Sequence, residues 1–151
     1  MKTATILSIL LTTGSSLAMP AKRADQAATI TDLFASQTSQ NGYVTFAFND
    51  PNNNDDTGAN VVWDRPGNPR NDSRTADAAY YVRFPGGVTD ISLFNLLVER
   101  VDGSEQFSIA INDNGNGAAP GTKWSCEGES GVYESKQCHY NGTISLTPAS
   151  P

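Results

Sequence analysis

The sequence predicts an all-β fold, namely a single antiparallel β-sandwich or small β-barrel. The 151-residue chain holds short runs of β-branched, aromatic and aliphatic residues, which are typical of strands. Gly, Asn, Asp and Pro separate these runs, and no helical pattern stands out beyond residue 23. Such a succession of short strands is typical of sandwiches and barrels. The expected strands cover residues 30–34, 43–48, 60–63, 79–84, 91–101, 107–111 and 144–146.

Local patterns indicate which residues of some strands face the core and where turns occur. The second strand alternates apolar residues with small or polar ones from Val44 to Phe48, which indicates one buried face. Tyr80 and Tyr81 are adjacent in the fourth strand, so one faces the core and the other faces solvent. Asn-Gly pairs at 41–42 and 141–142 have the composition of turns.

One hairpin can be predicted with its register. Asp102-Gly103 is a strong two-residue turn signal, and it places Val101 opposite Ser104. Arg100 then stands opposite Glu105, a charge pair worth about 0.2–1 kcal/mol. One face of the hairpin is apolar for three successive pairs, which are Val98/Phe107, Leu96/Ile109 and Phe94/Ile111. We therefore expect this hairpin at the centre of the core.

The N-terminus has the features of a secretory signal peptide. Lys2 precedes a short apolar run, and Ser16-Leu17-Ala18 supplies small residues at the first and third positions before a cut. The run is too short to span a bilayer. We expect residues 1–18 to be the signal peptide, cleaved after Ala18, and the protein to be secreted and extracellular.

A second processing step is expected just downstream. Lys22-Arg23 is a dibasic pair of the kind that Golgi proteases of fungi cleave. Residues 19–23 then form a short pro-segment, and residues 24–151 form the single domain, which is long enough for a real core.

The charge of the mature chain limits its partners. Removal of Lys2, Lys22 and Arg23 changes the formal net charge from −6 to −9. Such a surface repels phosphate backbones and anionic headgroups, so nucleic acid is not an expected partner. No later segment is apolar over a transmembrane length, so no membrane insertion is expected.

Two cysteines and two asparagines are candidates for covalent modification. Cys126 and Cys138 are the two cysteines, and an oxidising compartment favours their pairing as a disulfide. Asn71 and Asn141 begin the triplets Asn-Asp-Ser and Asn-Gly-Thr, which are glycosylation acceptors. Asn71 is expected to be the better acceptor because it lies in a polar stretch rich in Pro and Gly.

Metal sites and catalytic sites have weak support. The Asn-rich stretches at 49–58 and 112–117 offer oxygen ligands, but an EF-hand starting at Asp50 would have Asp55 and Val61 where Gly and Glu are required. His139 is the single histidine and lacks a nucleophile motif. We therefore predict no metal, no cofactor and no catalytic residue, while paired carboxylates for glycoside hydrolysis stay open.

A sugar-stacking surface is the remaining alternative. Aromatic residues could form it, although Trp and Tyr more often bury most of their area in a small core. The candidates are Trp63, Trp124, Tyr43, Tyr80, Tyr81 and Tyr133.

Four segments resemble a known family. The opening strand at 30–36, the alternation at 44–48, Trp124-Ser125-Cys126, and Cys138 before a terminal Ile-Ser-Leu strand are similar to the small secreted fungal β-barrel proteins related to the major Alternaria allergen. The similarity covers nearly all of residues 24–151. Family members usually carry an additional, earlier cysteine pair, and this chain has Val61-Val62-Trp63 about where one is expected.

The resemblance implies a compact β-protein released by a filamentous fungus, often recognised by plants as a defence elicitor or by people as an allergen. It implies no established catalysis. The sequence thus predicts a secreted, non-enzymatic protein that binds a host or cell-wall protein, or a glycan. The alternative is a carbohydrate-binding module or a small glycan-active enzyme.

Overall fold

The computed structural model describes residues 26–112, 123–129 and 135–148, and it confirms the all-β prediction. Over these ranges the chain forms strands and loops, and it contains no helix that could cross a membrane. The strands are β1 (Ala28–Thr38), β2 (Asn41–Asp50), β3 (Asp55–Asp64), β4 (Tyr80–Arg83), β5 (Leu93–Arg100), β6 (Gln106–Asn112), β7 (Trp124–Glu129), β8 (Ser135–Tyr140) and β9 (Ile144–Leu146).

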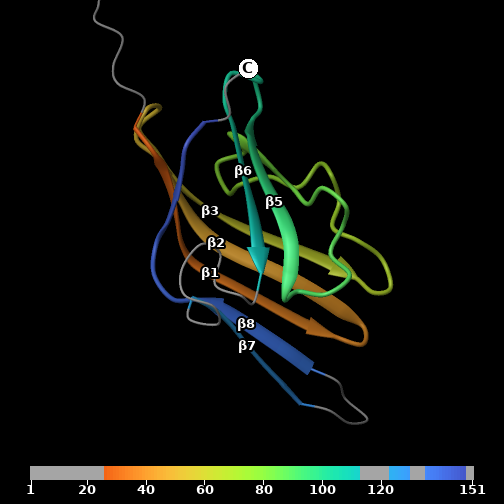
Figure 1. Ribbon diagram of the computed structural model, residues 1–151. Helices are drawn as coiled ribbons and strands as arrows, with labels where there is room; N and C mark the ends of the chain where they lie inside the picture. Colours follow the sequence, from red (N-terminus) through yellow and green to blue (C-terminus); the bar gives the residue numbers. More distant parts are fainter. Residues whose placement is uncertain (1–25, 113–122, 130–134, 149–151) are drawn as a thin grey trace, which may run out of the picture.

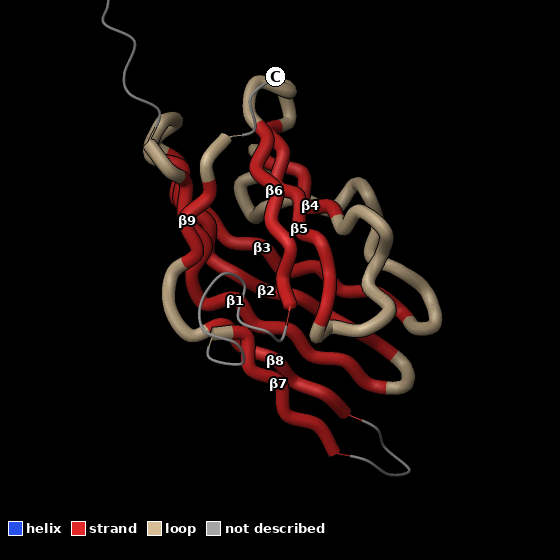
Figure 2. Tube along the Cα trace, viewed as in Figure 1, coloured by secondary structure: helices blue, strands red, loops and turns tan. Residues whose placement is uncertain are grey.

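The strands form two antiparallel sheets. Sheet A has the order β3-β2-β1-β8-β7, with β9 also pairing with β1, and sheet B has the order β4-β5-β6. In Figure 1, β5 and β6 run across the sheet that contains β1, β2 and β3. Figure 2 shows the same two layers, with long loops around β4. The fold is a sandwich in which most paired strands are hairpins, while β1 also pairs with the distant β8 and β9.

Aromatic rings from both sheets fill the core between the layers. On β2 the residues Val44, Phe46 and Phe48 are buried while the residues between them face outward, as a period of two requires. The Phe48 ring centroid lies 5.0 Å from that of Tyr80 on β4 and 5.6 Å from that of Phe107 on β6. These edge-on contacts join sheet A to sheet B.

A bulge changes the register of β1. Asp32 has a left-handed backbone (φ 54°), and the pairing with β2 shifts between Thr31 and Phe34. The extra residue allows Ile30 and Leu33, three positions apart, to be buried together. The next residue, Phe34, consequently points to the outer side of sheet A.

The predicted register of the β5–β6 hairpin is confirmed. The expected apolar pairs are those observed, and the connection is wider than the two-residue turn, with residues 101–105 outside the strands. Gly103 adopts the left-handed conformation there (φ 75°). The expected charge pair is wrong. Arg100 stands opposite Glu105 through a backbone hydrogen bond of 2.9 Å, but its guanidinium forms ion pairs with Asp55 and Asp102.

Some strands differ from the prediction. Strands β7 and β8 were not expected, because their sequences are mostly polar. Strand β3 starts at Asp55, inside a stretch that composition assigns to a loop. The predicted turn at residues 41–42 is also wrong, since both residues belong to β2 and the chain reverses at residues 39–40. Gly42 serves close packing instead, because a side chain there would collide with the Trp63 ring.

The predicted disulfide is present. Cys126 on β7 and Cys138 on β8 are directly opposite each other, with their Cα atoms 4.0 Å apart. The bridge closes the hairpin at the edge of sheet A and indicates an oxidising compartment.

The aromatic contacts between the sheets predict a large cost of truncation. Phe107→Ala should lower the free energy of unfolding by about 3–5 kcal/mol, because it leaves a cavity beside Phe48. Val62→Ala, at a side chain that is 61% exposed, should change it by less than about 0.5 kcal/mol. Urea denaturation of both variants checks this, and similar losses for the two would contradict the assigned core.

Candidate functional site: a polar cluster at one end of the sandwich

Buried polar side chains close one end of the core between the two sheets. Asp50 is the last residue of β2 and has an exposed fraction of 0%. It follows Val44, Phe46 and Phe48 in the same alternation, so the strand directs its carboxylate inward. A carboxylate in this position needs hydrogen-bond donors around it.

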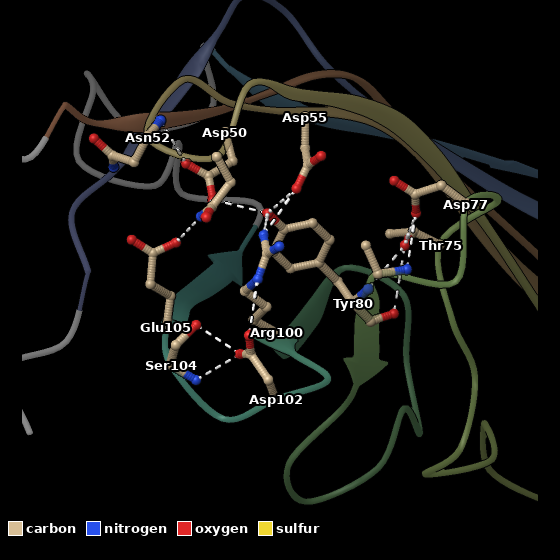
Figure 3. Close-up of polar contacts among 12 residues, drawn as sticks. Asp50, Asn52, Asp55, Thr75, Asp77, Tyr80, Arg100, Asp102, Ser104 and Glu105 are labelled. Carbon is tan, nitrogen blue, oxygen red and sulfur yellow. Dashed lines mark hydrogen bonds and ion pairs between the residues drawn. The ribbon is translucent and has the colours of Figure 1, made fainter.

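The Tyr80 hydroxyl lies among two carboxylates and a guanidinium (Figure 3). Its oxygen is 2.8 Å from Asp50 Oδ2, 2.9 Å from Asp55 Oδ2 and 3.0 Å from Arg100 Nη1. Burial, and then the hydrogen bonds and charges of the two aspartates, raise the pKa of Tyr80 far above its usual value. The hydroxyl therefore keeps its proton, donates to a carboxylate and accepts from Arg100.

A loop residue fixes Tyr80 at the start of β4. The Tyr80 amide donates to Thr75 Oγ1 (3.1 Å), and the Thr75 hydroxyl donates to Asp77 Oδ1 (2.6 Å), as Figure 3 shows. Thr75 is itself buried and bridges to Ala59 of β3. The loop before β4 thus holds the tyrosine against sheet A.

The loop after β2 supplies the other donors to Asp50. The Asn52 backbone N–H donates to Asp50 Oδ1 (3.0 Å), and the side-chain Asn53 Nδ2 donates to Asp50 Oδ2 (2.7 Å). Burial favours the neutral form of Asp50, but hydrogen bonds from Asn53, Tyr80 and Glu105 outweigh it and hold the pKa of Asp50 below its usual value. Asp50 is therefore ionised at neutral pH.

Glu105, the residue before β6, completes the cluster. Asn53 Nδ2 also donates to Glu105 Oε2 (2.5 Å). Burial, followed by the hydrogen bond to Asp50 and the charge of Asp50, raises the pKa of Glu105. The two carboxyls titrate as a pair in which Asp50 loses its proton first, and a protonated Glu105 donates to Asp50.

This arrangement suits a structural role better than catalysis. A carboxylate beside a carboxylic acid resembles a glycosidase pair, but the two groups of a glycosidase stand about 5 Å or more apart across the substrate. Here Asp50 and Glu105 both accept from the same Asn53 Nδ2 (2.7 and 2.5 Å), and Asp50 has no exposed surface. Within the described part of the chain, no three His, Cys, Asp or Glu side chains are grouped to hold a metal ion.

The other sequence candidates lie apart from this cluster. His139 is exposed on β8, and Tyr43 and Tyr81 are partly exposed on different sheets. Trp63 and Trp124 are only 4% and 0% exposed, and Tyr80 is buried, so a sugar surface made from these three is wrong. Tyr133 lies outside the described residues.

The two glycosylation triplets are both accessible. Asn71 and Asn141 are exposed in loops, so accessibility does not rank them and the preference for Asn71 stays a prediction. The processing residues Ala18, Lys22 and Arg23 lie outside the described residues, as do residues 113–117 of the second Asn-rich stretch.

The cluster was missed at the sequence level, although one signal for it exists. Asp50 continues the inward positions of β2, and a charged residue in that phase predicts a buried, paired carboxylate. The first Asn-rich stretch supplies much of the cluster, through Asp50, Asn52, Asn53 and Asp55.

Comparisons with known proteins add no assignment. The chain matches no family model, and neither the curated proteins nor the solved structures gave a significant match. The resemblance to fungal β-barrel proteins therefore rests on the residues quoted for it.

Glu105→Gln should make the protein more stable at neutral pH. Because the folded state raises the pKa of Glu105 above its ordinary value of 4.5, stability is lost as pH rises through the folded-state value. The introduced amide can still donate to Asp50 and accept from Asn53, so the variant should gain about 1 kcal/mol at pH 7. The two stability profiles should converge at low pH.

The control for this prediction is Glu127→Gln, which removes a negative charge from an exposed position on β7. Denaturant midpoints between pH 3 and pH 8 make the comparison. The raised pKa of Glu105 would be contradicted if the Glu105→Gln variant is less stable than the parent at pH 7, or if its stability changes with pH as that of the parent does.

Proposed function

We propose that the chain is a secreted, non-catalytic binding protein that acts at a host or cell-wall interface, in the manner of an elicitor or effector. The observation that carries this proposal is the closed state of the Asp50 cluster. Asp50 is fully buried and bonded to Asn52, Asn53 and Tyr80. Ionisable groups used in this way hold the sheets together, so function falls to the outer surfaces.

Secretion has two sources of support. The Cys126–Cys138 bridge fits an oxidising compartment, and the N-terminal residues have the composition of a signal peptide with a dibasic site. The formal charge of −9 expected for the mature chain argues against nucleic acid as a partner.

A small glycan-active enzyme is the second candidate. The contact between Asp50 and Glu105 and the opposite directions of their pKa shifts are the observations that favour it, because acid and base roles require such a separation. For this function Asp50 would have to become exposed to substrate.

A wall-binding assay with a sugar-release readout distinguishes the two candidates. The purified mature protein is incubated with fungal and plant cell-wall preparations, and both retained protein and soluble reducing ends are measured. We expect retention without sugar release, and we expect Glu105→Gln to be retained as the parent is. Protein unfolded by reduction and heat is the control for nonspecific adsorption.

Sugar release that Glu105→Gln abolishes would refute the binding proposal and favour the enzyme. For the elicitor role, the same preparation is infiltrated into leaves. A response to the folded protein but not to the unfolded control is expected.

A further inference from the structure

The outer face of sheet A displays two rows of side chains that cross five strands. The pairing registers place partners on the same face. The first row, from β3 to β7, is Asn60, Thr45, Phe34, His139 and Ser125. The second row is Val62, Tyr43, Ser36, Gln137 and Glu127. We call these ten residues the Phe34–Tyr43 face.

This face carries almost no charge, although the chain is acidic. It contains no Lys, Arg or Asp, and its one carboxylate, Glu127, lies on the outermost strand β7. The outer side of sheet B is different. There the Arg74 and Arg83 guanidinium carbons lie 4.7 and 4.5 Å from the Tyr81 ring centroid, and Arg83 pairs with Glu99. Charge is therefore sparse at the centre of the outer face of sheet A, and its nearest carboxylates on β3, Asp56 and Asp64, are the exposed residues that flank these two rows.

Two aromatic rings lie at the centre of the Phe34–Tyr43 face. Their centroids are 5.7 Å apart with planes inclined by 39°, both side chains are partly exposed, and Val62 beside Tyr43 is 61% exposed. The bulge at Asp32 directs Phe34 outward, since the shift in register follows a left-handed residue. Without that bulge, the alternation from Ile30 would turn Phe34 inward.

We propose that the Phe34–Tyr43 face binds a neutral, extended polysaccharide chain. This inference rests on the proposed function and names its ligand class. The apolar C–H faces of sugar rings pack on aromatic rings, and the amides of Asn60 and Gln137 can both donate to and accept from sugar hydroxyls. Neighbouring strands are about 4.8 Å apart, close to the length of one pyranose unit, so a chain running across the strands meets one strand per sugar.

Charge selects the neutral glycan over other ligands. An acidic polysaccharide or an anionic lipid would be repelled by the net negative chain. A basic peptide would find one carboxylate, Glu127, among these ten residues, and Asp64 at their margin.

The proposal is tested by measuring how much of the protein is retained on insoluble chitin, cellulose and β-1,3-glucan, each used alone. Calorimetry with soluble oligomers of the retained polymer then gives Kd for the full mature chain and its variants. Phe34→Ala and Tyr43→Ala should each raise Kd at least tenfold. Asn60→Ala and Gln137→Ala should each raise Kd a few-fold. Both side chains are exposed, so these variants do not disturb the core.

Tyr81→Ala is the matched control, because it removes a partly exposed aromatic residue from the outer side of sheet B and should leave Kd unchanged. Thermal melting of every variant separates lost binding from lost folding. If Phe34→Ala does not fold, Asn60→Ala and Gln137→Ala still decide the outcome.

Three results would overturn the inference. If a polysaccharide is retained equally by the parent, Asn60→Ala, Gln137→Ala and Tyr43→Ala, the face is wrong and the binding function stands. If no polysaccharide is retained but the leaf response persists, the ligand class is wrong and the binding function again stands. If wall retention and leaf response are both absent, the proposed function fails together with the inference.

Discussion

The hydrogen bonds of the Tyr80 hydroxyl are the interaction on which the closed end of the sandwich depends. They join a strand of sheet B to Asp50 and Asp55, which end β2 and begin β3 of sheet A. The Tyr80 ring packs against Phe48 in the same contact, so one side chain provides both apolar burial and polar pairing between the layers. The buried Asp50 carboxylate would be costly without its hydrogen-bond donors, of which Tyr80 is the one from sheet B. Arg100 supplies a compensating positive charge, because its guanidinium forms an ion pair with Asp55.

The ionisable groups of this cluster are closed to substrate. A catalytic pair needs a carboxyl group that substrate can reach, and Asp50 offers none because its oxygens are buried and bonded within the protein. The outer face of sheet A differs, because Phe34, Tyr43 and Val62 keep apolar surface accessible among neutral amides and hydroxyls. Accessible apolar surface therefore lies on this outer face and not at the Asp50 cluster.

The sequence predicted those features that depend on local patterns. The alternation in β2 and the turn at residues 102–103 were sufficient for two strands and a full hairpin register, because period and turn composition act over a few residues. Strands β7 and β8 were not predicted because the pairing of β8 with β1 and the disulfide between β7 and β8 determine them rather than their own propensity. The partner of Arg100 was also out of reach, since Asp55 is 45 residues away. The Phe34–Tyr43 face depends on a bulge marked only by Asp32, and a single Asp within an apolar run does not by itself predict a change of register.

A double-mutant cycle between Tyr80→Phe and Asp50→Asn tests the central claim most directly. Unfolding free energies of the parent, the two single variants and the double variant are measured in urea. The account predicts that Tyr80→Phe costs about 1–3 kcal/mol because it removes a hydrogen-bond donor from the carboxylates at the closed end of the core. It also predicts that the two changes are coupled by more than about 0.5 kcal/mol. Additive effects, or a Tyr80→Phe variant as stable as the parent, would show that the hydroxyl does not hold the two sheets together.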